Sequence, residues 1–213
     1  MSEPCSVQTD SGSVLLQAAR SNRVLTDVPL NESDRFVEDA LDLLAFANGQ
    51  TSNQSSWGGV RRQMGHEAPF ALTRLEIGNE ERVLHGNDGY AGHYKLIADR
   101  LWATHPDLVI IASGRWLGPS VDGSPCMNGA RCDVWDEHFY ETPDAMAAMG
   151  KQYDSYNRSW PAVFVGEYAA NKPEGAPTLR AAIAESVFML GLERNADVVW
   201  PHSPPPERAQ SVR

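Results

Sequence analysis

The sequence predicts an α/β fold of the (β/α)8 barrel type, incomplete, with about strands four to eight and their helices. Short apolar, β-branched runs alternate with segments of helical periodicity. Successive strand ends lie about thirty residues apart, the length that such a barrel spends on one strand and one helix. A doubly wound sheet is disfavoured because the chain lacks a Gly-rich phosphate motif.

The elements can be placed in order along the chain. An apolar stripe over residues 36–47 predicts the first helix, with Ser33 as its cap and Gly49 at its end. The elements expected after it are a strand over 70–77, a helix over 94–102, strands over 108–113 and 132–140, a helix over 143–156, a strand over 161–165, a helix over 178–194 and a strand over 197–200.

About three strands of a closed barrel are missing from this series. The N-terminal segment, residues 1–32, is poorly defined and offers only 13–16 and 23–25 as weak strand candidates. Residues 33–200 form the partial barrel domain, and the Pro-rich tail over 201–213 is expected to be disordered. An open half-barrel would expose unpaired strand edges, which natural proteins avoid.

Composition narrows the possible partners. The 213 residues carry a formal net charge of -10 with scattered basic residues, which argues against nucleic-acid binding. No apolar run is long enough to cross a bilayer, so a soluble protein is expected. The first 22 residues lack the basic patch and apolar segment of a secretion signal. The oligomeric state is left open.

Sequons and cysteines indicate whether the protein could enter an oxidising, secretory compartment. Three sequons begin at Asn31, Asn53 and Asn157 and make a glycoprotein one expectation, although such triplets also arise by chance. Cys126 and Cys132 lie close together in a loop rich in Gly, Ser and Pro. Their spacing alone leaves a disulfide between them open.

Glutamates follow two of the predicted strands. The runs 70–77 and 161–165 each end at a glycine, and Glu80 and Glu167 come just after. The carboxyl ends of parallel strands open onto one face, so the two side chains are expected to converge. Two carboxylates there suit glycoside hydrolysis. A solvated or Arg-paired role is the commoner one for any single glutamate.

The residues around His138 allow two interpretations, a group of side chains near Glu167 or a metal site. Strand alternation puts His138 and Tyr140 on the same side. Together with Asp133, Asp136 and Glu137, His138 has the ingredients of a metal site, but the spacing matches no standard zinc motif, and no metal is predicted.

Two more glutamates and two tryptophans also have alternative roles. Glu76 shares the strand parity of Glu80 and is expected to point into the barrel, whereas Glu81 is expected to be exposed. Trp57 and Trp135 suit stacking on a sugar or packing in the core.

Four motifs resemble the α-L-arabinofuranosidases of glycoside hydrolase family 51. Residues 57–80 are similar to the stretch around the acid/base of that family, and 136–140 to its Asp-x-His-x-Tyr strand. Residues 165–169 resemble its nucleophile strand, and 191–199 the lead into its last barrel strand. The resemblance covers residues 36–199. Family members also carry the first barrel strands and a β-sandwich domain, which are not visible here.

The resemblance implies a role for each candidate residue. Glu80 would be the general acid/base and Glu167 the nucleophile, with Asn79, His138 and Tyr140 binding substrate. An acid/base needs a raised pKa, and a nucleophile needs donors that keep it charged.

The implied activity is that of a retaining hydrolase which needs no cofactor. It would release terminal α-L-arabinofuranosyl groups from oligo- or polysaccharides of plant cell walls, with the full-length enzyme secreted. Two alternatives stay open: a truncated, non-catalytic carbohydrate-binding or vestigial barrel fragment, and a barrel hydrolase of another glycan, such as a xylanase or glucanase.

Overall fold

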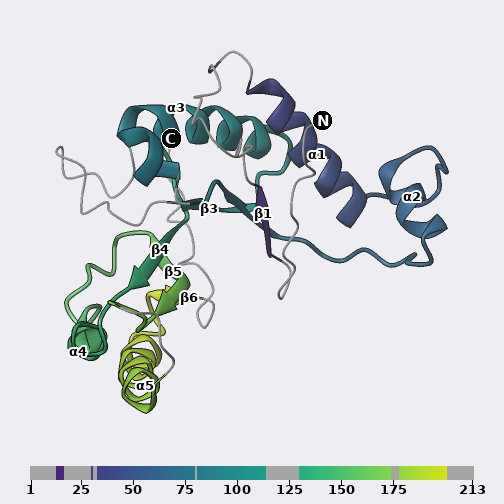
Figure 1. Cartoon of the computed structure of the whole chain (residues 1–213). Coiled ribbons are helices and arrows are strands. Elements are labelled where there is room, and N and C mark those ends of the chain that lie inside the picture. The colour runs from purple at the N-terminus through teal and green to yellow at the C-terminus, as the bar shows by residue number, and fades with distance from the viewer. Residues whose placement is uncertain are drawn as a thin grey trace. The chain divides into compact units, whose positions relative to one another are not determined.

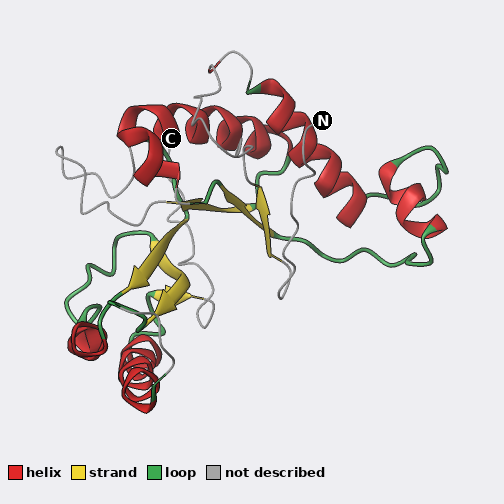
Figure 2. Ribbon diagram, in the orientation of Figure 1, coloured by secondary structure: helices red, strands yellow, loops and turns green. Residues whose placement is uncertain are grey.

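The computed structural model describes residues 13–16, 30, 33–79, 81–113, 130–173 and 178–200, with main chain alone for 13–16 and 81–89. The chain divides into two compact units. The first comprises residues 1–113 and 127–131, and the second comprises 114–126 and 132–213. Both carry parallel strands and helices, so the predicted α/β class is confirmed (Figure 1 and Figure 2).

The first unit is a parallel sheet with helices on one face. Its strands pair in the order β1–β2–β3, and α1 and α3 lie along the same face of this sheet (Figure 1). The elements are β1 (Ser13–Leu16), α1 (Asp34–Asn48), α2 (Trp57–Gln63), β2 (Arg74–Ile77), α3 (Glu81–Thr104) and β3 (Val109–Ser113). The weak strand candidate at 13–16 is therefore a strand, and the candidate at 23–25 lies outside the described residues.

Helix α1 buries the stripe that its sequence predicts. Its buried residues are Phe36, Val37, Ala40, Leu44 and Ala47. The expected cap is wrong, because the Ser33 hydroxyl makes no capping bond to the helix. It lies 2.7 Å from Nδ1 of His93 on α3 instead. Ser33 therefore ties the two helices together.

Strand β2 is shorter than predicted, beginning at Arg74 and not at Phe70. The side-chain amide of Asn48 bonds both main-chain groups of Leu72, accepting from its N–H at 2.8 Å and donating to its carbonyl at 2.7 Å. Ala71 has a φ of 54°, which interrupts the extended backbone. The bonds that a neighbouring strand would make are thus taken by a side chain.

A buried arginine organises the loops around α2. Arg61 is 1% exposed and donates to the main-chain oxygens of Phe46, Gly49, His66 and Glu67 at 2.5 to 3.2 Å. These carbonyls come from the end of α1 and from the turn after α2. One guanidinium, with its five donors in a fixed fork, therefore satisfies backbone acceptors of two segments.

The second unit repeats the same layering. Its strands pair in parallel in the order β4–β5–β6, with α4 and α5 side by side on one face (Figure 1). The elements are β4 (Val134–Tyr140), α4 (Pro143–Ala148), the short 3-10 helix η3 (Met149–Lys151), β5 (Ala162–Ala169), α5 (Leu179–Arg194) and β6 (Val199–Trp200). Trp135, Met146, Val163 and Phe188 belong to the core between these layers. Trp135 is thus a core residue and not a sugar platform, whereas Trp57 is 45% exposed.

The helix expected over 143–156 ends early. Helix α4 stops at Ala148, and the 3-10 turn that follows brings Gly150 against α5. A Cβ atom on Gly191 would lie 2.3 Å from the Gly150 carbonyl oxygen, so α5 packs directly on this backbone. A 3-10 turn thus stands where further turns of the helix were expected, and it brings Gly150 close to Gly191.

Other sequence predictions concern the loops and tail. Cys132 is disulfide-bonded, while Cys126 lies outside the described residues, as does the tail over 201–213. Among the helices that the structure describes, none combines the length and apolar character needed to span a membrane.

We expect Arg61→Ala to lower the free energy of unfolding by about 3 kcal/mol, because it removes a buried guanidinium that bonds four main-chain oxygens. Urea denaturation measures this loss. Arg62→Ala, on the next and more exposed residue, is the matched control and should cost at most about 1 kcal/mol. Equal midpoints for the two variants would refute the role of Arg61.

The second unit should lose stability at alkaline pH. Burial, and the Glu137 carboxylate that accepts its hydroxyl, raise the pKa of Tyr153 above its usual value of 10.0. The folded state then holds a proton that the unfolded state releases, so stability is full below about pH 10 and falls as the pH rises. Denaturation midpoints between pH 8 and 11 measure the fall. Tyr153→Phe should weaken this pH dependence, and an unchanged slope would contradict the assignment.

Candidate active site

The two faces of β4 carry different side chains. Trp135 and Phe139 belong to the core that faces α4 and α5. Asp136, His138 and Tyr140 alternate with them and point to the other face. The prediction that His138 and Tyr140 share a side is confirmed by their common contact, the carboxylate of Glu167.

Strand β5 runs past the glycine that was expected to end it. Asp136 lies opposite Phe164, whereas His138 lies opposite Glu167, so β5 advances three residues while β4 advances two. The extra residue makes a β-bulge next to Gly166. The predicted end of this strand at Val165 is therefore wrong.

The bulge decides which way Glu167 faces. Before the bulge, Val163 points into the core between the sheet and the helices. After the bulge, Tyr168 points to the same face and packs edge-on against Phe188 of α5. Five positions separate the two residues, so regular alternation would put them on opposite faces. The inserted residue reverses the parity, and Glu167 faces away from the helices.

Asp136 holds the bulge in place. Its Oδ1 accepts the Gly166 N–H at 2.9 Å, and its Oδ2 lies 2.5 Å from Nε2 of His138. Asp136 is 2% exposed. A Cβ atom at position 166 would lie 2.5 Å from the same Oδ1, so a larger residue there would displace this carboxylate. One buried carboxylate thus orients both the imidazole and the backbone before Glu167.

The Glu167 carboxylate contacts two side chains of β4 and is partly open to solvent. Its Oε2 accepts the Tyr140 hydroxyl at 2.5 Å and lies 3.5 Å from Nδ1 of His138. The Glu167 side chain is 39% exposed, whereas that of His138 is 4% exposed. The arrangement therefore holds the carboxylate by one oxygen and leaves it accessible.

The neighbouring acidic residue takes no part in this cluster. Glu137 points to the helix face of β4, where it accepts the hydroxyl of Tyr153. It cannot share a metal ion with His138 on the opposite face. In the part of the chain that the structure describes, no group of three side chains is arranged to hold a metal.

The end of β2 has a strand–turn–helix geometry. Gly78 has a φ of 86°, which suits glycine, and Asn79 follows it before α3 begins at Glu81. Tyr90 of α3 clamps the strand ends: its hydroxyl donates to the Ile77 carbonyl at 2.5 Å and accepts the Ser113 N–H at 2.8 Å.

The predicted site residues divide between the two units. Glu167, His138 and Tyr140 lie together in the second, and Asn79 lies at the end of β2 in the first. Glu80 lies outside the described residues, so its convergence with Glu167 stays a prediction. Glu76, expected to point into the barrel, is buried on β2.

The bridging role of Asp136 was not predicted from the sequence, where this residue was a possible metal ligand and the first position of the Asp-x-His-x-Tyr motif. Its spacing of two residues from His138 and four from Tyr140 was a usable signal, because it puts all three side chains on one face of β4.

Comparison with known proteins assigns the family. The family described as "Alpha-L-arabinofuranosidase 1 domain" matches residues 10–158. The chain belongs to this α-L-arabinofuranosidase family. It is 37% identical to an extracellular exo-α-L-arabinofuranosidase of Streptomyces chartreusis over 188 residues, and 37% identical to α-L-arabinofuranosidase 1 of Arabidopsis thaliana over 165. The resemblance to arabinofuranosidases noted in the sequence is thereby confirmed.

Solved structures of family members agree with this assignment. An arabinose-bound GH51 α-L-arabinofuranosidase superposes with a TM-score of 0.68 and 28% identity, over 81% of this chain and 28% of its own. The Thermotoga maritima enzyme, at 20% identity and a TM-score of 0.59, shows the likeness of fold. The chain spans less than a quarter of the length of its first two curated relatives, 22% and 23%.

Removing the Asp136 carboxylate should destabilise the second unit. We expect Asp136→Ala to cost about 3 kcal/mol, because it leaves the Gly166 N–H and the buried His138 without their shared partner. Chemical denaturation followed by tryptophan fluorescence measures the loss. Asp144→Ala, which removes a 79% exposed carboxylate paired with Arg180, should cost at most about 1 kcal/mol. Similar losses for both would refute the bridging role.

Proposed function

We propose that this arabinofuranosidase family member carries the catalytic centre of a retaining glycoside hydrolase that releases terminal α-L-arabinofuranosyl groups. The observation that carries the proposal is the Glu167 carboxylate, held by Tyr140, faced by His138 and open to solvent. Glu167 is the nucleophile and Glu80 the general acid/base. Asn79, His138 and Tyr140 bind the sugar.

The contacts of Glu167 fit the needs of a nucleophile. An attacking carboxylate must be held in place, and the Tyr140 hydroxyl fixes one of its oxygens. This bond occupies Oε2, which leaves Oε1 to attack the anomeric carbon. His138 is held at its other nitrogen by Asp136, so its ring has little freedom to turn away.

The reaction proceeds in two steps. Glu80 protonates the departing oxygen while Glu167 attacks the anomeric carbon, which yields a glycosyl-enzyme and a free alcohol. Glu80 then takes a proton from water, and this water displaces Glu167 to release arabinose. Glu80 regains from water the proton that it gave to the alcohol, and Glu167 is released unchanged. The proposed reaction therefore uses no cofactor or metal.

The described strands form one arc of a (β/α)8 barrel in this proposal, with residues 33–200 as the partial catalytic domain. Parallel strands in chain order support it, as does the likeness to GH51 structures. The outer face of α5 adds support: Leu179, Ile183 and Leu190 are 77%, 57% and 61% exposed. A neighbouring strand–helix unit of a barrel would cover such a face.

The substrate class follows from the family. Arabinose-bearing oligo- or polysaccharides of hemicellulose and pectin are the proposed partners, which places the protein in L-arabinose metabolism. The Streptomyces chartreusis relative is described as extracellular, which supports an extracellular location for the full-length enzyme.

A second candidate is a non-catalytic carbohydrate-binding or vestigial barrel fragment. Purified chain that binds arabinose and releases none from an aryl α-L-arabinofuranoside would support this alternative. Parallel assays on aryl xylosides and glucosides test for a hydrolase of another glycan.

Glu167→Ala should lower the release of arabinose from an aryl α-L-arabinofuranoside by at least about a thousandfold and abolish the glycosyl-enzyme seen by mass spectrometry. Glu80→Ala should spare substrates with activated leaving groups, because these depart without protonation. Glu193→Ala, on the exposed surface of α5, is the matched control and should keep full activity. Normal turnover by the Glu167 variant would overturn the assignment.

A further inference from the structure

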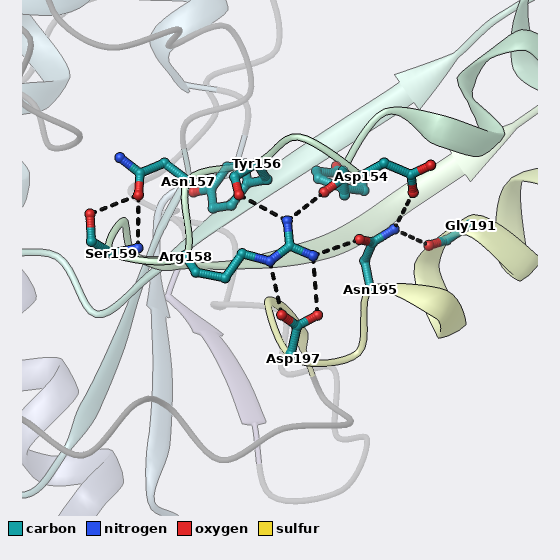
Figure 3. Close-up of polar contacts among 9 residues, drawn as sticks. Asp154, Tyr156, Asn157, Arg158, Ser159, Gly191, Asn195 and Asp197 are labelled. Atoms are coloured by element: carbon teal, nitrogen blue, oxygen red, sulfur yellow. Dashed lines mark hydrogen bonds and ion pairs between the residues drawn. The ribbon is translucent and has the colours of Figure 1, made fainter.

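The sequon at Asn157 lies in a turn that the structure describes completely. Asn157, Arg158 and Ser159 fall between η3 and β5, and all three side chains are exposed. The Asn157 Oδ1 accepts the Ser159 N–H at 3.0 Å and the Ser159 hydroxyl at 2.8 Å. Figure 3 shows the amide nitrogen of Asn157 directed away from the other side chains drawn.

The residue between them anchors the turn. Arg158 donates to the main-chain oxygens of Tyr153 and Tyr156 at 2.9 and 2.8 Å. Its other donors reach Asp197 at 2.9 and 3.3 Å and Asn195 at 2.8 Å (Figure 3). The bond from Arg158 holds the pKa of the Asp197 carboxyl below its usual value, so this pair stays charged near neutral pH.

Asn195 connects Arg158 to buried groups of the second unit. It is 3% exposed, and its amide donates to Asp154 and to the Gly191 carbonyl of α5, both at 2.9 Å. The turn therefore rests on α5 and on the segment before β6. Arg158 points inward to this network, and Asn157 points outward.

We propose that Asn157 is an N-glycosylation site, which carries an N-acetylglucosamine-linked oligosaccharide when the chain passes through a secretory compartment. The Asn157 Nδ2 attacks the anomeric carbon of a lipid-linked oligosaccharide diphosphate, loses one proton, and the C–O bond to the diphosphate breaks. Oδ1 keeps both bonds to Ser159, because the new bond forms at the nitrogen. The folded turn thus accommodates the glycan unchanged.

The glycan would lie at the opposite end of β5 from Glu167. Asn157 precedes the strand, which begins at Ala162, and Glu167 is near its carboxyl end. Five residues of extended chain separate Ala162 from Glu167, roughly 17 Å. A bulky, hydrated group there leaves the open side of the Glu167 carboxylate free.

The sequon at Asn31 has a different environment. Asn31 itself lies outside the described residues, but its third residue, Ser33, is fully buried and bonded to His93. The hydroxyl of that sequon is enclosed in the fold, whereas Ser159 is exposed. The sequon at Asn53 is exposed and must be removed in the test.

The test isolates Asn157 by removing the other two sequons. The full chain with Asn31→Gln and Asn53→Gln is translated with a cleavable signal peptide in the presence of microsomes, and signal cleavage reports translocation. We expect one endoglycosidase-sensitive mobility shift in the translocated protein. The shift should vanish with Asn157→Gln and with Ser159→Ala, and persist with Ser159→Thr. Translocated protein without a shift would overturn the proposal.

A second measurement tests whether the turn accepts the glycan. Chain secreted from yeast is compared before and after enzymatic removal of the glycan. The two forms should share one denaturation midpoint, because the bonds of Arg158 and Ser159 are unaffected. A glycosylated form that melts well below the deglycosylated one would contradict the role of the folded turn.

Discussion

The β-bulge beside Gly166 is the constraint on which the candidate active site depends. Strand β5 contributes to a core on one face and carries the Glu167 carboxylate on the other. Val163 and Tyr168 both pack toward α5, which a regular strand does not allow. The inserted residue, held by Asp136, resolves this conflict and turns Glu167 to the face that carries His138 and Tyr140.

The same carboxylate couples the backbone to the side chains. Asp136 accepts from Gly166 through one oxygen and contacts His138 through the other. Displacing either partner would disturb its neighbour, since the carboxylate is buried and has little room to shift. A stiff support of this kind is what a reacting group needs, because small misplacements cost large factors in rate.

Two arginines stiffen the loops that lead into strands. Arg61 donates hydrogen bonds to main-chain carbonyls of the segments before β2, and Arg158 donates to carbonyls of the turn before β5. In each case a planar cation replaces the bonds that an irregular segment lacks. The amino ends of these strands are thus locked by polar bonds. Asn79 follows the carboxyl end of β2, and Glu167 lies near the carboxyl end of β5.

Much of the architecture could be predicted from the sequence. Helical and strand periodicity located α1, α3, α5 and the parallel strands, because burial of one face imposes a regular repeat on each element. The two Gly-flanked glutamates and the family motifs indicated the chemistry. Alternation along β4 placed His138 with Tyr140.

The places where helices and strands depart from their expected bounds are set by contacts in the folded chain. The bulge in β5 depends on the Asp136 side chain of the neighbouring strand, and the late start of β2 depends on Asn48, twenty-four residues away from Leu72. The early end of α4 depends on the close approach of Gly150 and Gly191. These are contacts between segments distant in the chain, and a local pattern does not record them. Residue types and their periodicity therefore predict the helices, the strands and the candidate chemistry, whereas packing sets the face of the sheet to which each side chain points.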